Sequence, residues 1–246
     1  MGTWFRRRST WTGALVGLVI SVGAPLGLWA LLRICGLDPS AGAGRVALLY
    51  SAIGTAFMFS LLGGISGLLI DRQRDAALRD GLTGLYNRRF LRESLPRLQA
   101  AAARAKEPLC VIMLDLDHFK LVNDRHGHLI GDQTLRAVAT TLERSSRRSD
   151  LVARYGGEEF AVLCPGTDCE TGLQVADRLR EAVAAIGPEA LGHPGPQTVS
   201  LGVAVQSPSV ELSPEALLDH ADEALYAAKD GGRNRSIAWL DGAKFQ

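Results

Sequence analysis

The sequence lacks the features that mark several classes of protein. Its four cysteines (Cys35, Cys110, Cys164 and Cys169) form neither a CxxC pair nor a zinc-type spacing, so we interpret them as buried or free thiols. With 27 basic and 26 acidic residues, the chain has no global basic field, and we expect no nucleic-acid partner. The part after the first 70 residues contains no internal repeat or low-complexity segment, which argues against a repeat array.

Charge is also absent from two long apolar runs, residues 11–32 and 46–70. Each run exceeds the roughly 20 helical residues that cross a bilayer core, so we predict two transmembrane helices. The basic residues 6–8 would also suit a cleaved signal peptide, but the first run is long for one and lacks a clear small-residue cleavage site.

Arginines indicate the orientation of this membrane region. They precede the first run and follow the second, so both termini are expected in the cytoplasm and the segment 35–44 outside. We therefore expect a multi-pass protein of the inner (cytoplasmic) membrane, in contact with lipid. Close helix approach is suggested by three GxxxG spacings: Gly13/Gly17, Gly23/Gly27 and Gly63/Gly67.

The remaining sequence reads as a helical linker over 71–79, a domain over 80–238 and a tail over 239–246. Periodicity predicts helices over 87–105, 129–147, 171–186 and 214–229. Short apolar or β-branched runs predict strands over 109–114, 151–155, 160–164 and 198–205. Helices alternating with strands, with one hairpin, indicate an α/β fold with a mixed sheet covered by helices.

Two pairs of acidic residues stand at strand ends of this domain. Asp115 and Asp117 follow the apolar run 109–114, and Glu158 and Glu159 follow the glycine pair 156–157 at a hairpin tip. Either pair alone suits a strand end or turn that meets water. Together they suit two magnesium ions held by carboxylates and substrate phosphates, as in nucleotidyl transfer.

Four sequence blocks, in order, resemble the GGDEF family of diguanylate cyclases. They are DGLTGLYNRR at 80–89, DLDHFKLVNDRHGHLIGD at 115–132, GGEEF at 156–160 and AKDGGRN at 228–234, and the resemblance covers about residues 80–238. It implies a palm-like nucleotidyl cyclase fold with a central five-stranded sheet. It also implies Mg²⁺-dependent condensation of two GTP molecules into cyclic di-GMP by a homodimer, since each half-reaction joins two substrates.

The resemblance also assigns roles to individual residues of this sequence. It implies two Mg²⁺ ions per site, with Mn²⁺ as an alternative, and the ligands Asp115, the Leu116 carbonyl, Glu158 and Glu159. It implies catalytic roles for Glu159, Glu158 and Lys120, and guanine reading by Asn123 and Asp132. Phosphate binding is assigned to His118, Phe119, Lys120, Lys229 and Arg233, and inhibitory binding of the product to Arg147 and Asp150.

Several alternatives stay open at this point. Asp117 suits a metal ligand or a structural role, and His126 with His128 has the HxH pattern of a metal pair, although His128 falls at a structural position of the family. Lys229 and Arg233 also suit the C-terminus of a helix. The domain as a whole could instead be a non-catalytic cyclic di-GMP receptor or an enzyme for another nucleotide.

Overall fold

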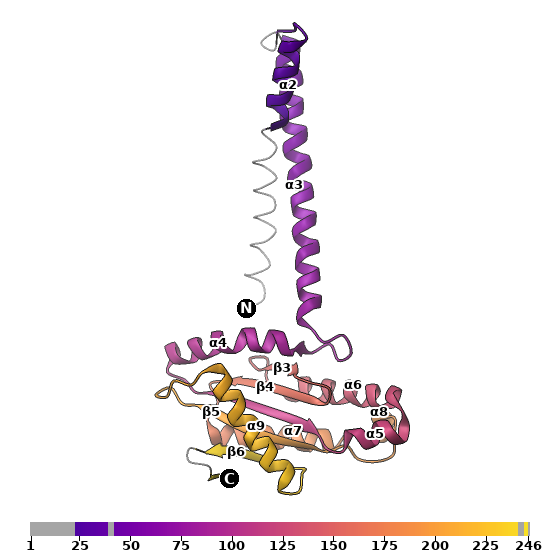
Figure 1. Cartoon of the computed structure of the whole chain (residues 1–246), viewed down its shortest axis with the longest axis vertical. Helices are drawn as coiled ribbons and strands as arrows, with labels where there is room; N and C mark the ends of the chain where they lie inside the picture. Colours follow the sequence, from indigo (N-terminus) through magenta and orange to yellow (C-terminus); the bar gives the residue numbers. More distant parts are fainter. Residues whose placement is uncertain (1–22, 39–41, 241–243, 246) are drawn as a thin grey trace. The chain divides into compact units, whose positions relative to one another are not determined.

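The computed structural model describes residues 23–38, 42–240 and 244–245, and the chain divides into two units, Met1–Ala77 and Leu78–Gln246 (Figure 1). The first unit contains α2 (Gly23–Ile34) and most of α3 (Gly42–Leu78). Helix α3 continues through residues 71–78, which are all but the last residue of the expected linker 71–79.

One helix among the described residues is long and apolar enough to cross a membrane, over Gly44–Leu62. The expected first span falls mostly on residues 1–22, outside the described part, as do Gly13 and Gly17. Its described remainder lies in α2, whose 12 residues extend only about 18 Å. The described residues therefore do not support the prediction of two transmembrane helices.

The second unit alternates helices and strands, largely as the sequence pattern predicts. Its elements are β1 (Tyr86–Asn87), α4 (Arg88–Ala105), β2 (Leu109–Leu116), α5 (Phe119–His126), α6 (His128–Ser145), β3 (Leu151–Arg154), β4 (Glu159–Pro165), α7 (Cys169–Ala184), α8 (Pro188–Leu191), β5 (Val199–Gln206), α9 (Pro214–Asp230), β6 (Ser236–Leu240) and β7 (Lys244–Phe245).

The sheet is mixed, and its strand order is β1-β3-β4-β2-β5-β6, with β7 paired to the outer edge of β6. Strands β3-β4-β2-β5 are antiparallel neighbours, whereas β1 and β6 join the sheet in parallel pairings. The palm-like α/β expectation is confirmed by the comparisons below, but the expected five strands are too few. Strand β1 is only two residues long, so it carries no alternation that could reveal it in the sequence.

Helices cover both faces of this sheet (Figure 1). Every residue of the central strand β2 is buried, and alternate side chains enter two separate cores. Cys110, Ile112 and Leu114 pack with residues of α6 and α7, whereas Leu109 and Val111 pack with residues of α4 and α9. Because both faces are buried, β2 appears in the sequence as a continuous apolar run.

Helix ends follow their local sequence signals. The side chains of Asn87, Asp168 and Ser213 accept hydrogen bonds from the first turns of α4, α7 and α9. Helix α9 packs directly on β5 at Gly202, which has no side chain. A Cβ atom at this position would lie 2.1 Å from the Ala221 carbonyl oxygen of α9. This close contact fixes α9 beside the sheet and, with it, the cationic residues at the end of the helix.

Candidate functional site

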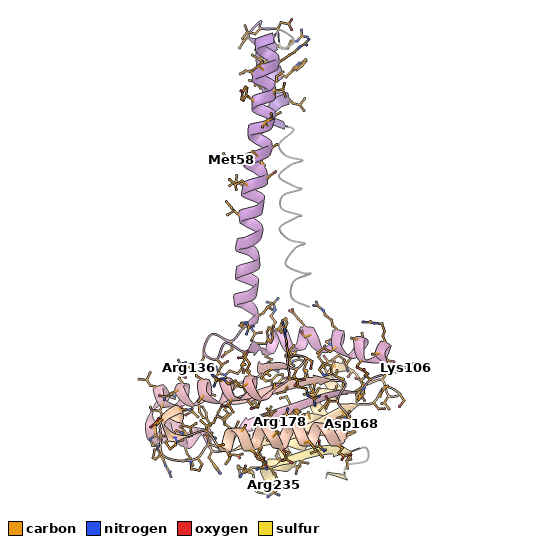
Figure 2. The ribbon with its side chains drawn as sticks, turned by 180° about the vertical axis from the view of Figure 1, so that it is seen from behind. Met58, Lys106, Arg136, Asp168, Arg178 and Arg235 are labelled. Atoms are coloured by element: carbon orange, nitrogen blue, oxygen red, sulfur yellow. The ribbon has the colours of Figure 1, made fainter. Side chains whose placement is uncertain are left out.

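The two acidic pairs meet at one end of the sheet. Asp115, near the C-terminal end of β2, lies opposite Glu159 in the antiparallel pairing with β4. The Leu116 amide donates to the Glu158 carbonyl oxygen at 3.2 Å, which continues this pairing into the hairpin. Figure 2 shows Lys106 and Asp168 at the same end of the domain. Lys106 precedes β2 and Asp168 follows β4, so this end of the strands is the one opposite the acidic residues.

Lys229 provides the nearest positive charge to this site. Its Nζ atom lies 2.8 Å from Oδ2 of Asp115, whose side chain is 10% exposed. Burial raises the pKa of the Asp115 carboxyl, and the hydrogen bond and charge of Lys229 act against that shift. Burial and the neighbouring charge of Asp115 also raise the pKa of Glu158. The site therefore concentrates negative charge that a cation would stabilise.

The glycine hairpin is closed by its own backbone and by an arginine. The amides of Tyr155 and Gly156 donate to the Glu159 carbonyl oxygen at 2.8 and 3.2 Å. A Cβ on Gly156 would lie 2.1 Å from Oε2 of Glu159, so the glycine makes room for this carboxylate. Sequence reasoning missed Arg154, which binds the Gly157 carbonyl oxygen at 2.6 Å and Oδ1 of Asp80 at 3.1 Å.

The contact with Arg154 is one of several hydrogen bonds that hold the Asp80 carboxylate. Its carboxylate also accepts from the Thr83 amide at 2.9 Å and the Thr83 hydroxyl at 2.7 Å. Burial raises the pKa of Asp80, but the hydrogen bonds from Thr83 and Arg154 outweigh it and the net shift is downward. Asp80, close to the start of the second unit, thus fastens the hairpin through Arg154.

The predicted nucleotide-reading residues come from α5 and α6, which meet at a glycine. A Cβ on Gly131 would lie 1.9 Å from Oδ1 of Asn123, so Asn123 lies directly against α6, the helix that also carries Asp132. Helix α5 itself was not predicted; it has only eight residues and a mixed polar and apolar composition. Its phenylalanine, Phe119, is buried in the core at 5% exposure, as a packing residue would be.

The N-terminus of α5 follows an unusual backbone conformation. His118 precedes the helix with φ at 57°, in the left-handed region that non-glycine residues rarely adopt. The first amides of a helix have no partner within it and suit an anion. Lys120 is exposed on the first turn. The start of α5 therefore combines the amides of a helix N-terminus with an exposed lysine.

Asp117 has a different environment from Asp115. It is 5% exposed, and its carboxylate accepts hydrogen bonds from the hydroxyls of Thr198 and Ser200 and from the Asn234 amide. Asn234 follows Arg233, whose positive charge acts against the upward pKa shift of Asp115. The structure thus favours the structural alternative for Asp117.

The expected inhibitory pair lies in a single turn. The Arg147 amide donates to Oδ2 of Asp150 at 2.7 Å, and the Asp150 amide donates to the Arg147 carbonyl oxygen at 3.0 Å. Arg147 is an exposed residue. The turn therefore presents a cation to solvent just before β3.

Metal-binding alternatives receive no support from clustering. Across the described residues, no group of three or more His, Cys, Asp or Glu side chains is arranged to hold a metal ion. The imidazole of His126 stacks on that of His193 with 5.4 Å between ring centroids. The expected ligands Asp115 and Glu158 supply two carboxylates, and Lys229 forms an ion pair with that of Asp115. A complete coordination shell around a metal ion would therefore need further oxygens from substrate or water.

Comparisons with known proteins agree on the domain. The family model described as "Diguanylate cyclase, GGDEF domain" matches residues 77–235. The chain is 43% identical over 166 residues to the diguanylate cyclase DgcP of Pseudomonas aeruginosa, covering 68% of this chain and 24% of that protein. It is 40% identical over 171 residues to the response regulator PleD of Caulobacter vibrioides, covering 68% and 37%. It therefore spans well under half the length of these relatives.

Solved structures extend this agreement to the fold. The coiled coil and GGDEF domain of DgcB from Caulobacter crescentus, solved with c-di-GMP, has a TM-score of 0.67 at 34% identity, covering 74% of this chain and 97% of that one. The active GGEEF domain of a diguanylate cyclase from Vibrio cholerae has a TM-score of 0.58 at 30% identity, covering 63% and 98%. Since the family model matches more than half of the sequence and the paired acidic strand ends lie together, the chain belongs to the GGDEF family of diguanylate cyclases.

Proposed function

We propose that this protein is a diguanylate cyclase (EC 2.7.7.65) that condenses two GTP molecules into cyclic di-GMP and releases pyrophosphate. The observation that supports it most directly is the pairing of Asp115 with the GGEEF hairpin across β2 and β4, beside Lys229. A degenerate, non-catalytic member of the family is expected to lose an acidic residue at one of these positions. This sequence keeps Asp115, Glu158 and Glu159.

Magnesium fits the residues at this end of the sheet, and Mn²⁺ is a plausible substitute. The Asp115 and Glu158 carboxylates and the Leu116 carbonyl offer hard oxygen ligands. Burial raises the pKa of both carboxyls and repulsion from a neighbouring carboxylate adds to the shift, so a bound cation would stabilise their ionised forms. Two bound ions would supply charge neutralisation at the phosphates and activation of the attacking hydroxyl. Glu159 is proposed as a further ligand or as the group that receives the 3′-hydroxyl proton.

Cationic groups of the chain would bind the triphosphate. When Asp115 has another cation as partner, the Lys229 ammonium is free to leave it for a phosphate oxygen, because its side chain is 32% exposed and flexible. Lys120 and the backbone amides at the start of α5, after His118, would contact the β and γ phosphates. Arg233 would add a guanidinium from the turn after α9.

Guanine selection is proposed for Asn123 and Asp132. A carboxylate accepts hydrogen bonds from the guanine N1 and N2 donors, a donor pair that adenine lacks. The contact of Asn123 with Gly131 on α6 brings the two helices together and so supports a shared base pocket. This argument favours GTP over another nucleotide.

We further propose a homodimer, product inhibition and membrane anchoring. The product joins two nucleotides symmetrically, so two sites must face each other during each bond formation. Arg147 and Asp150 would bind cyclic di-GMP as an inhibitor, because an exposed cation in a fixed turn suits a phosphate. Helix α3, with its 19-residue apolar segment, would contact lipid and hold the domain at the cytoplasmic face of the inner membrane.

The direct test uses the full-length chain in detergent with GTP and Mg²⁺, followed by separation of the products. The wild type is expected to yield cyclic di-GMP and pyrophosphate, Glu159→Ala to yield almost none, and ATP to give no cyclic dinucleotide. Binding of cyclic di-GMP without any synthesis would establish the non-catalytic receptor instead.

A further inference from the structure

We propose that Asp117 is a positioning residue for nucleotide binding: it holds the turn between α9 and β6 so that Arg233 stays directed toward the phosphate side of the site. The proposal rests on the function proposed above. Asp117 is a buried acid to which the proposed metal and substrate contacts assign no role. We refer to residues 231–235 as the α9–β6 turn.

Both carboxylate oxygens of Asp117 are already engaged. Oδ1 accepts from the Ser200 hydroxyl at 2.7 Å, and Oδ2 accepts from the Thr198 hydroxyl at 2.8 Å and from the Asn234 amide at 3.0 Å. The residue is 5% exposed. A carboxylate that accepts three hydrogen bonds has little capacity left for a metal ion, in contrast to Asp115, which pairs with the partly exposed ammonium of Lys229.

The backbone of Asp117 is fixed as firmly as its side chain. Its amide donates to the Thr198 carbonyl oxygen at 2.9 Å, and its carbonyl oxygen accepts from the Gln197 side chain at 2.9 Å. Ser200 lies near the start of β5, the neighbour of β2 in the sheet, and Thr198 directly precedes that strand. The carboxylate is therefore a fixed point from which the α9–β6 turn can be held.

The α9–β6 turn needs such an anchor because its backbone is unfavourable. Arg233 and Asn234 have φ values of 64° and 45°, and neither is a glycine. Left-handed conformations of this kind persist only where surrounding contacts impose them. The contacts here include the Asp117 bond to the Asn234 amide and a 3.4 Å bond from Arg180 to Oδ1 of Asn234. The Arg233 amide donates to the Ala228 carbonyl oxygen, and the Arg233 carbonyl oxygen accepts from Nε of Arg235 at 3.2 Å.

Among these contacts, Asp117 alone links the turn to the strand that carries Asp115. Loss of its carboxylate would remove one strong hydrogen bond to the turn and leave the Asn234 amide without its acceptor. The turn would then be free to relax toward ordinary backbone angles and carry the Arg233 side chain away. Asp117 would thus affect GTP affinity through Arg233, without touching the nucleotide.

A double-mutant cycle tests this indirect action. Binding of a non-hydrolysable GTP analogue with Mg²⁺ is measured on the full-length chain in detergent for Asp117→Ala, Arg233→Ala and the double variant. Each single change is expected to weaken binding about 10- to 100-fold, the range of a lost charged hydrogen bond. The double variant should be no more than about twofold weaker than the weaker-binding single variant, because both changes remove one contact. Additive losses would overturn the proposal.

Conservative substitutions separate positioning from metal binding. In Asp117→Asn, the amide oxygen can still accept from Asn234, and the amide nitrogen can donate to the Ser200 hydroxyl, which is able to reverse its role. We expect Asp117→Asn to recover most of the affinity lost in Asp117→Ala, whereas Asp115→Asn, the matched change at the proposed ligand, should abolish Mg²⁺-dependent turnover. Equal loss of turnover in both Asn variants would refute the positioning role.

Amide hydrogen exchange provides a readout that does not depend on catalysis. Without nucleotide, the α9–β6 turn should exchange faster in Asp117→Ala than in the wild type, while strand β2 remains protected. If Asp117→Ala fails to fold, Ser200→Ala removes a single bond to the same carboxylate and should show a smaller change of the same kind. Wild-type protein that makes no cyclic di-GMP would refute the proposed function only; unchanged exchange in the turn would refute the anchor.

Discussion

The ion pair between Lys229 and Asp115 gives a sharp prediction for Lys229→Met. The substitution keeps much of the side-chain volume on α9 but removes the charge that lies 2.8 Å from Oδ2 of Asp115. The carboxyl would then remain in a site where burial already raises its pKa, without the cation that opposes the shift. We expect Lys229→Met to destabilise the domain at neutral pH in the absence of metal and nucleotide.

The size of the effect follows from the exposure of the two side chains. Breaking a fully buried ion pair costs about 3–5 kcal/mol, since it leaves one charge uncompensated. Here Asp115 is 10% exposed but Lys229 is 32% exposed, so solvent already screens part of the attraction. We therefore expect a loss of about 1–3 kcal/mol in the free energy of unfolding.

The pH dependence identifies the cause. A carboxyl whose pKa is raised on folding favours the folded state in its protonated form, so that contribution is present at low pH and is lost as pH rises through the folded pKa. Lys229→Met raises this folded pKa further. Its deficit relative to the wild type should therefore be largest near pH 8 and shrink as the pH falls toward about 5, in urea unfolding without Mg²⁺.

Two control variants make this prediction refutable. Asp115→Asn combined with Lys229→Met removes both charges and should recover stability to within about 1 kcal/mol of the wild type. Lys120→Met, at an exposed lysine of α5, should change stability by no more than about 0.5 kcal/mol. A deficit in Lys229→Met that is the same at both pH values, or that persists in the double variant, would show that lost packing and not an uncompensated charge is responsible.

Three further outcomes are expected. Gly202→Ala should cost several kcal/mol in thermal or urea unfolding because its new Cβ meets the backbone of α9, whereas the matched Gly187→Ala, with open space around it, should change stability by less than about 1 kcal/mol. Cyclic di-GMP should inhibit synthesis by the wild type and by Arg148→Ala but not by Arg147→Ala, as measured by product formation with added cyclic di-GMP. Equal inhibition of all three proteins would exclude an inhibitory role for the turn. Asp80→Asn should lower the free energy of unfolding of the domain at neutral pH. This difference from the wild type should vanish as the pH falls through the lowered pKa of Asp80, because the protonated wild-type carboxyl loses the same interactions. A difference in stability that persists at low pH would contradict this.

Much of the domain could be predicted because its signals are local. The helix Pro214–Asp230 agrees with the predicted range 214–229 to within one residue, and Ser213 and Gly231 cap its two ends. The strand Leu109–Leu116 is readable because burial on both faces leaves an uninterrupted apolar run. By contrast, α5 and β1 are too short to develop a period, and β6 becomes a strand through its pairings with β5 and β7.

The site divides in the same way. The glycine pair followed by Glu158 and Glu159 was visible in the sequence as a tight, acidic hairpin, since glycine and carboxylate act through local geometry and charge. That Asp115 lies opposite Glu159 depends on strand register, which pairs residues 44 positions apart in the chain. Neither residue carries a local signal of this partnership.

Residue identity and spacing along the chain were enough to reveal the family resemblance, the acidic residues and the cationic residues at the end of α9. How the acids divide their roles depends on contacts between distant parts of the chain. Asp115 and Asp117 are separated by one residue, yet Asp115 pairs with the partly exposed ammonium of Lys229 while Asp117 accepts hydrogen bonds from two hydroxyls and an amide. Their difference arises from β5 and the α9–β6 turn, which the fold brings to β2 from more than 80 residues further along the chain.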